Sequence, residues 1–121
     1  MVRLIDLQPT HIPRSKSINF LKNLSREELE KLGLPQIWET PEGLLISDGN
    51  NRCLRYASLG LHEIEVDYCR EDGPYGFLIR MDELKDMAKH LRERLIFSPY
   101  DLCRTRDGLV FEQPMIDVYS D

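Results

Sequence analysis

The 121-residue chain has few cysteines and lacks a long hydrophobic run. Its three cysteines, Cys53, Cys69 and Cys103, are odd in number and far apart in the sequence. This spacing excludes a disulfide framework and a Cys-x-x-Cys metal or redox pair, so we expect three unpaired thiols in a reducing, cytoplasmic compartment. No apolar stretch approaches the ~18 residues that a membrane span needs, and we therefore expect neither a signal peptide nor a membrane partner.

A surplus of basic residues is also missing. The formal net charge is −5 and the sequence pI is about 5.2. Residues 61–121 alone hold 14 acidic against 8 basic side chains. Attraction to nucleic acid needs Lys and Arg gathered on one face, so specific DNA binding is not expected.

What is present suffices for one globular domain. A length of 121 residues with 41% hydrophobic side chains supplies one ordinary core. No internal repeat and no low-complexity linker divides the chain. We expect a single α+β domain over residues 1–121, with a small mixed sheet and flanking helices.

Hydrophobic periodicity and turn residues predict the individual elements. Val2–Asp6 is expected to be a first strand, and residues 8–17, which contain prolines, an extended and exposed connection. Ser25 forms a capping box with Glu28 at the start of a helix that ends near Gly33. The further predicted elements are a hairpin of strands 36–40 and 44–47, a helix over 50–59 ended by Gly60, a strand over 64–68, a helix over 82–94, and a hairpin of strands 102–106 and 109–112.

The turn between the strand over 44–47 and the following helix is the clearest candidate site. A strand that passes straight into a helix leaves the first backbone N–H groups of that helix unpaired, and an anion can bind there. We expect Gly49 to let the backbone approach a ligand, and Asn50 and Asn51 to donate side-chain amides. Arg52 offers a planar fork for phosphate oxygens, and its charge at the positive end of the helix is expected to need an anion. An ordinary capping turn has the same composition, which is the alternative on spacing alone.

Residues 44–60, LLISDGNNRCLRYASLG, followed by Ile64-Glu65-Val66, resemble the signature of the ParB/sulfiredoxin superfamily. That signature is a strand, an Asp-Gly-His-His-Arg turn, an Ala-containing helix, a glycine and a closing strand. The resemblance covers about residues 2–69 and leaves residues 70–121 as a C-terminal extension. It implies a ParB/sulfiredoxin-like fold in which the turn holds the phosphates of a nucleotide.

Departures from the family pattern limit what the resemblance implies. Asn50 stands where sulfiredoxins carry their reactive cysteine, so sulfinic acid reduction is not expected. Asn50 and Asn51 replace histidines of the signature, which removes titratable groups from the turn. Residues 70–121 are too short and too acidic for the helix-turn-helix region that follows this domain in ParB partition proteins.

Further candidates flank the turn. By the resemblance, the connection with His11 runs beside the nucleotide, where His11 is a candidate general base toward a hydroxyl acceptor. Arg14, Ser15 and Lys16 are candidates to complete the phosphate shell. Asp48 is a candidate ligand for a magnesium ion carried with the nucleotide. Each also has a plain alternative, namely an exposed loop residue or, for Asp48, a local hydrogen-bond acceptor in the turn.

Two functions are left open by these patterns. The first is a small cytoplasmic nucleotide- or phosphate-binding protein, with phosphotransferase or nucleotide hydrolase activity as the expected class. The second is a non-catalytic interaction or regulatory module that retains the fold without the chemistry and has a protein partner.

Overall fold

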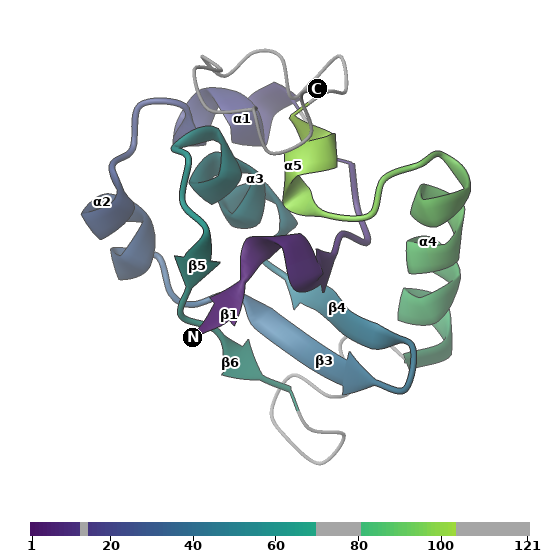
Figure 1. The fold of residues 1–121 in the computed structure, drawn as a ribbon. Coiled ribbons are helices and arrows are strands. Elements are labelled where there is room, and N and C mark those ends of the chain that lie inside the picture. The colour runs from purple at the N-terminus through teal and green to yellow at the C-terminus, as the bar shows by residue number, and fades with distance from the viewer. Residues whose placement is uncertain (13–14, 70–80, 104–121) are drawn as a thin grey trace.

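A computed structural model describes residues 1–12, 15–69 and 81–103, and its backbone is α+β, as expected (Figure 1). The elements follow in the order β1 (Val2–Arg3), the 3-10 helix η1 (Leu4–Asp6), β2 (Leu7–Gln8), α1 (Ser15–Leu21), α2 (Arg26–Lys31), β3 (Gln36–Thr40), β4 (Gly43–Asp48), α3 (Asn50–Ser58), β5 (Glu63–Ile64), β6 (Asp67–Tyr68), α4 (Met81–Glu93) and α5 (Pro99–Leu102). Within these ranges no helix is of a length and apolarity that would let it cross a bilayer.

The strands form a small mixed sheet, which confirms the expected arrangement. Its order is β2-β4-β3-β6, with β4 antiparallel to β3 and parallel to β2, and with β6 parallel to β3. A separate antiparallel pair joins β1 to β5. The expected hairpin is present as β3 and β4, where Ile37 pairs with Ile46 and Trp38 with Leu45.

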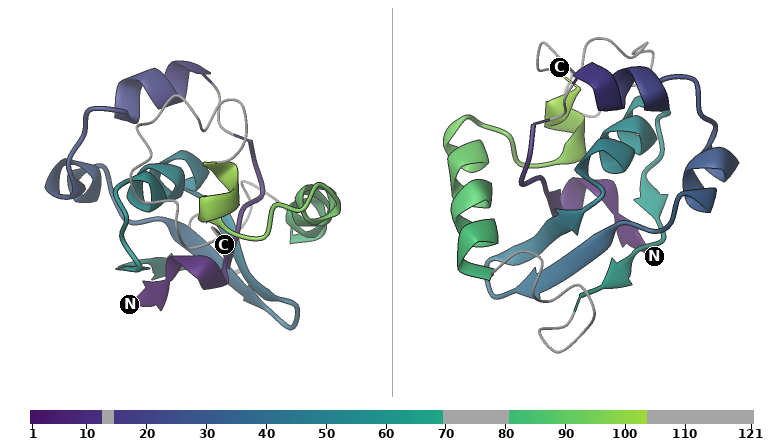
Figure 2. Two further views of the ribbon diagram at one scale, coloured as in Figure 1. Left: turned by 45° about the horizontal axis from the view of Figure 1, so that its top comes forward. Right: turned by 180° about the vertical axis from the view of Figure 1, so that it is seen from behind.

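Helices cover both faces of the sheet (Figures 1 and 2). Successive strand residues point to opposite faces, so Ile37 and Ile46 enter the main core with α3 and α5. Trp38 and Leu45 enter a second cluster with residues of α4 on the other face. The buried members of the main core include Leu4, Leu7, Leu29, Cys53, Leu54, Tyr56, Ala57, Ile64, Leu91, Ile96, Tyr100, Leu102 and Cys103. Residues 81–103 therefore pack into the same core as the first 69 residues.

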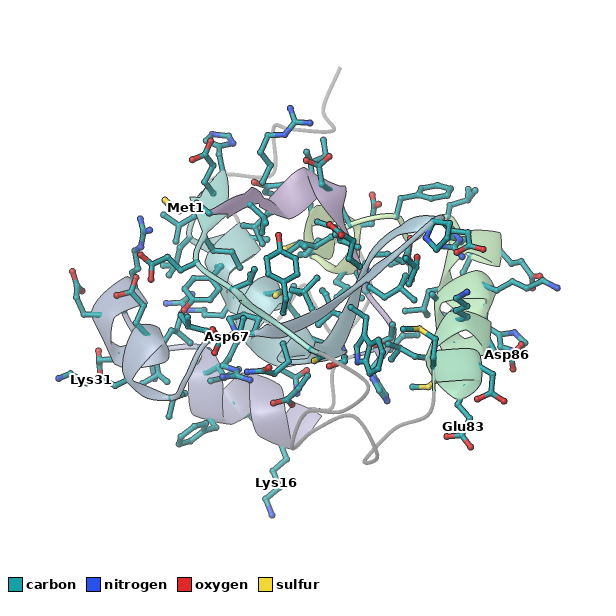
Figure 3. All side chains as sticks on the ribbon, turned by 90° about the horizontal axis from the view of Figure 1, so that it is seen from below. Met1, Lys16, Lys31, Asp67, Glu83 and Asp86 are labelled. Atoms are coloured by element: carbon teal, nitrogen blue, oxygen red, sulfur yellow. The ribbon has the colours of Figure 1, made fainter. Side chains whose placement is uncertain are left out.

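Local signals gave several elements correctly. Ser25 and Glu28 form the expected capping box at α2. The helices expected over 50–59 and 82–94 are α3 and α4, and Gly60 ends α3 with φ of 79°. The acidic side chains Glu83 and Asp86 project from α4 away from the sheet (Figure 3).

The first strand and the connection after it differ from the prediction. The expected strand Val2–Asp6 is interrupted by η1, because Leu4 is fully buried and its N–H donates to the carbonyl of His62 at 2.9 Å. The connection expected to be exposed is buried at Gln8 and Thr10. Their polar groups are satisfied inside, since Gln8 donates to Ile96 O and the Thr10 hydroxyl to Ile46 O. Within that expected connection, α1 already begins at Ser15.

Two later predictions also differ. The strand expected over 64–68 is split into β5 and β6, which belong to different sheets because β5 pairs with β1 and β6 with β3. Leu102, expected in a strand, lies in α5, where Pro99 occupies the first turn and Asp101 Oδ2 accepts from the N–H groups of Phe97 and Ser98. The rest of the hairpin expected over 102–112 lies outside the described residues.

Candidate functional site

An open groove of about 950 Å³ lies between α1, the connection from α2 to β3, and the turn from β4 to α3. One wall is apolar and is formed by Ile12, Phe20, Leu21, Leu32 and Leu34. The polar part of the lining is formed by residues 47–52 of the turn and by His11, Lys16, Gln36 and Asp67. The groove thus brings the predicted turn together with His11 and Lys16.

The start of α3 supplies unpaired donors to the polar wall. Gly49 is the N-cap, with φ of 100° and ψ of 21°, and no side chain caps the helix. The first bond of the helix runs from the N–H of Cys53 to the carbonyl of Gly49, at 2.9 Å. The N–H groups of Asn50, Asn51 and Arg52 have no hydrogen-bond partner in the part of the chain that the structure describes. An anion at this point would find three converging donors.

Gly49 cannot be replaced without strain. Its left-handed φ favours glycine, and a Cβ there would lie 3.1 Å from Pro35 Cα and 3.0 Å from Arg52 Nη2. Gly49 thus has a backbone conformation that favours glycine, and the close approach of this backbone to a ligand stays a prediction. The close neighbour that the structure shows is Pro35, which packs against the turn at Gly49.

The side chain of Asn50 holds the turn to the preceding connection. It is only 6% exposed, its Oδ1 accepts from the Thr10 N–H at 2.8 Å, and its Nδ2 donates to Thr10 Oγ1 at 3.0 Å. Nδ2 also lies 3.3 Å from His11 Nδ1. The amide is thus taken up by contacts with the connection, and the backbone N–H is the group that Asn50 offers a ligand. The side chain of Asn51 is half-buried and lines the groove.

Arg52 joins the turn after α2 to the turn between β4 and α3. Its Nη1 donates to the carbonyl of Gly33 at 2.6 Å, and its Nη2 pairs with Asp48 Oδ2 at 3.2 Å. The expectation that its charge needs a ligand anion is wrong, because a backbone carbonyl and a carboxylate already compensate it. The guanidinium has five N–H groups, and Nε–H has no partner among the described residues, so Arg52 can still donate to a phosphate.

The carboxylates of the groove balance its cations. Asp48 is 70% exposed while it pairs with Arg52, and Asp67 accepts from Gln36 at 3.5 Å. Lys16 projects from α1 (Figure 3). In the described part of the chain, no three His, Cys, Asp or Glu side chains gather as a metal site. One or two carboxylates suit a magnesium ion only when ligand phosphates complete its shell.

The remaining predicted residues are placed as follows. His11 lines the groove and is exposed. Ser15 begins α1, but its side chain lies outside the described part, as does Arg14.

Sequence reasoning missed Thr10, Asp67 and the apolar wall. Phe20 carried a usable signal, because a large aromatic next to the apolar face of a short helix is a candidate contact surface.

The thiols do not contribute a nucleophile. Cys53 and Cys103 are buried and all three cysteines are unpaired, as expected. Burial raises the pKa of Cys53 and that of Cys103 to about 12. Burial also raises the pKa of Cys69, which lies 3.0 Å from Ser47 Oγ. Each therefore stays a thiol at neutral pH, and thiolate chemistry is not expected in the groove.

Comparison with known proteins adds no family to this description. No protein-family model, no curated protein and no solved structure matches the chain. The resemblance of residues 44–60 to the ParB/sulfiredoxin signature therefore rests on the motif itself, and the function has to be argued from the groove.

Proposed function

We propose that the chain is a nucleotide- or phosphate-binding domain that holds phosphate at the N-terminus of α3. The observation that carries this proposal is the set of three backbone N–H groups, those of Asn50, Asn51 and Arg52, without a partner among the described residues and at the wall of a groove. A phosphate would pair with these donors and gain from the positive end of the helix dipole. The resemblance of the turn to the ParB/sulfiredoxin signature supports the same ligand class.

The apolar wall favours a nucleotide over a bare phosphate. A groove of about 950 Å³ lies within the usual range for small-molecule sites, roughly 300 to 1,000 Å³. Phe20 is 64% exposed and Leu32 is 46% exposed, and both line the groove. An aromatic ring exposed beside a phosphate cradle is suited to stacking on a base, an interaction of roughly 1 to 3 kcal/mol.

The charge balance favours a ligand that brings its own cation. Lys16 and Arg52 are offset by Asp48 and Asp67, so the described lining of the groove has no surplus of positive side chains for a polyphosphate. A magnesium ion bound to the phosphates would be attracted by the exposed carboxylate of Asp48. We therefore expect the ligand to bind as its magnesium complex.

A ligand screen tests the proposal directly. Thermal unfolding is followed with ATP, ADP, CTP, GTP and inorganic phosphate, each with and without magnesium. A ligand at a hundredfold excess over its dissociation constant stabilises the fold by about 2.7 kcal/mol, so a specific nucleotide gives a clear rise in melting temperature. No shift with any of them contradicts the proposal.

A charge reversal on α1 locates the binding. Lys16→Glu is expected to weaken nucleotide binding by about tenfold, which corresponds to about 1.4 kcal/mol, because it places a carboxylate at the groove. Lys22→Glu is the matched control, since Lys22 is exposed but does not line the groove. Calorimetric titration of both variants compares them. Equal affinities would place the ligand elsewhere.

A second candidate function is a non-catalytic module that binds the nucleotide and leaves it intact. It is favoured by Asn50, whose side chain is taken up by structural contacts where the resembling signature has a titratable residue. Release of inorganic phosphate from the best ligand of the screen, or its transfer to an added hydroxyl compound, would favour the phosphotransferase or hydrolase. Tight binding without turnover would favour the module.

A further inference from the structure

Three polar residues form a row across neighbouring strands of the sheet. Gln36 of β3 pairs with Asp48 of β4 on one side and with Asp67 of β6 on the other, and all three residues line the groove. Neighbouring strands lie about 4.8 Å apart, so the row from Asp48 to Asp67 spans roughly 10 Å. Asp48 directly precedes Gly49, the N-cap of α3, so the proposed phosphate site lies at one end of the row and Asp67 at the other.

The length of this row suits a nucleotide. In a nucleotide the sugar separates the phosphates from the outer edge of the base by a similar distance. Phosphates bound at the start of α3 would therefore bring the edge of the base within reach of Asp67. This step rests on the proposed function, because the phosphate site fixes the other end of the ligand.

The carboxylate of Asp67 is held in place and can still accept hydrogen bonds. In the described part of the chain, the exposed side chain of Asp67 accepts one hydrogen bond, from Gln36 Nε2 to Oδ2 at 3.5 Å. The same nitrogen of Gln36 also donates to Leu34 O, at 3.4 Å. A carboxylate has about four lone pairs on its two oxygens, so both oxygens of Asp67 can accept from a ligand.

Two accepting oxygens distinguish the bases by the donors on their edges. Guanine has two neighbouring donors, N1–H and the exocyclic N2 amine, which match a carboxylate in a bidentate pair. Adenine and cytosine each have an accepting ring nitrogen next to their amine, and uracil has one N–H between two carbonyls. These three bases would set an acceptor against the carboxylate, which leaves one of its oxygens without a donor and weakens binding.

We propose that the groove binds a guanine nucleotide, with its phosphates at the start of α3 and with the N1–H and N2 amine of its base donating to Asp67. The base is then bound by two different contacts. Its face packs on the exposed ring of Phe20, which accepts any base, and its edge pairs with Asp67, which accepts guanine.

Calorimetric titration with GTP, ITP, ATP and CTP, each with magnesium, tests the choice of base. GTP is expected to bind at least about tenfold more tightly than ATP or CTP. ITP keeps N1–H but lacks the N2 amine, so its affinity is expected to fall between them. Nucleotides that bind equally whatever their base overturn this proposal and leave the phosphate site standing. Binding of none of them overturns the proposed function as well.

An exchange of one carboxylate oxygen for an amide nitrogen tests Asp67 itself. Asparagine presents one acceptor and one donor, which match N1–H and the O2 carbonyl of xanthine, so Asp67→Asn is expected to bind XTP about tenfold more tightly than GTP. Glu65→Gln is the matched control, since Glu65 is exposed, lies outside the groove lining and loses the same charge. It is expected to keep the preference for GTP.

The two variants decide the role of Asp67. A preference for GTP that persists in Asp67→Asn, or that is lost in Glu65→Gln, overturns the proposal. Thermal melts of the ligand-free variants check that both fold, as expected for exposed positions. If Asp67→Asn does not fold, the series of GTP, ITP and ATP affinities of the unmodified protein decides.

Discussion

At the residue scale, the turn beside the groove depends on Gly49 having no Cβ. Gly49→Ala is expected to destabilise the fold by roughly 1 to 3 kcal/mol, because alanine at φ of 100° is strained and its Cβ meets the backbone of Pro35. Urea unfolding measures the loss. The control is Gly43→Ala, at φ of 130° but with nothing within 4 Å, where the turn has room to readjust. An equal loss in both variants would mean that Pro35 plays no part.

Arg52 has a structural role as well as its place at the groove. Arg52→Ala removes the donors to Gly33 O and to Asp48, so we expect the ligand-free protein to lose roughly 1 to 2 kcal/mol of stability. Asp48→Ala is the control that isolates the ion pair. Because Asp48 is 70% exposed, its loss is expected to cost less than 1 kcal/mol. Chemical unfolding that ranks the two in the opposite order would mean that the carboxylate, not the Gly33 carbonyl, anchors Arg52.

Because two of its thiols are buried, the folded protein is expected to lose stability as the pH rises into the alkaline range. The pKa of Cys53 is about 12 in the folded protein, whereas a thiol in the unfolded chain ionises near ~8.5. Between these values the unfolded state binds fewer protons than the folded state, so the free energy of unfolding falls by about 1.4 kcal/mol per pH unit for each such thiol. The contribution is complete below the lower value and is lost toward the upper one. Unfolding at increasing pH is expected to show a smaller slope for Cys53→Ala, and an unchanged slope would contradict the burial of the thiol.

The residue scale also shows what the sequence could not reveal. The need for glycine at position 49 was predictable, because the change from strand to helix is local. The bonds that join Arg52 to Gly33 and Asn50 to Thr10 were not, since they link residues 19 and 40 positions apart in the chain. A side chain that is free in a sequence motif can be fully used once distant segments fold against it.

At the element scale, the end of α4 carries a strained leucine. Leu95 has φ of 64°, is 71% exposed and is followed by a bond from the N–H of Ile96 to Leu91 O at 2.9 Å. This is the helix ending at which glycine is favoured, so Leu95→Gly is expected to stabilise the fold by about 0.5 to 1 kcal/mol. Leu32→Gly, at φ of −76° and also exposed, is expected to destabilise it. Thermal melts of the pair give the signs, and a destabilised Leu95→Gly would show that the leucine side chain contributes to packing.

The elements that were predicted well are those with local signals. The capping box of α2, the turn of the β3–β4 hairpin and the apolar faces of α3 and α4 are all encoded within a few residues. The errors lie where pairing is non-local. The interruption at η1 and the division of residues 64–68 between two sheets depend on strands far away in the chain.

At the scale of the whole molecule, the C-terminal helices complete the core. A chain that ends at Cys69 would uncover Trp38 and Leu45 on one face and would lose Tyr100, whose hydroxyl donates to the carbonyl of Leu61, on the other. We expect this shortened chain to lack a cooperative thermal transition, whereas the full chain has one. Circular dichroism melts compare the two. A cooperative melt of the shortened chain would mean that residues 2–69 fold by themselves.

The short outer strands of the sheet have a consequence for behaviour in concentrated solution. Among the described residues, the sheet ends at β2 on one side and at β6 on the other, and each has two residues. A long, flat edge would offer a row of unpaired backbone groups to another chain, which is how sheets grow into fibrils. Edges of two residues offer very few such groups. We therefore expect the folded protein to resist fibril formation through its sheet, even though its surface charge is modest.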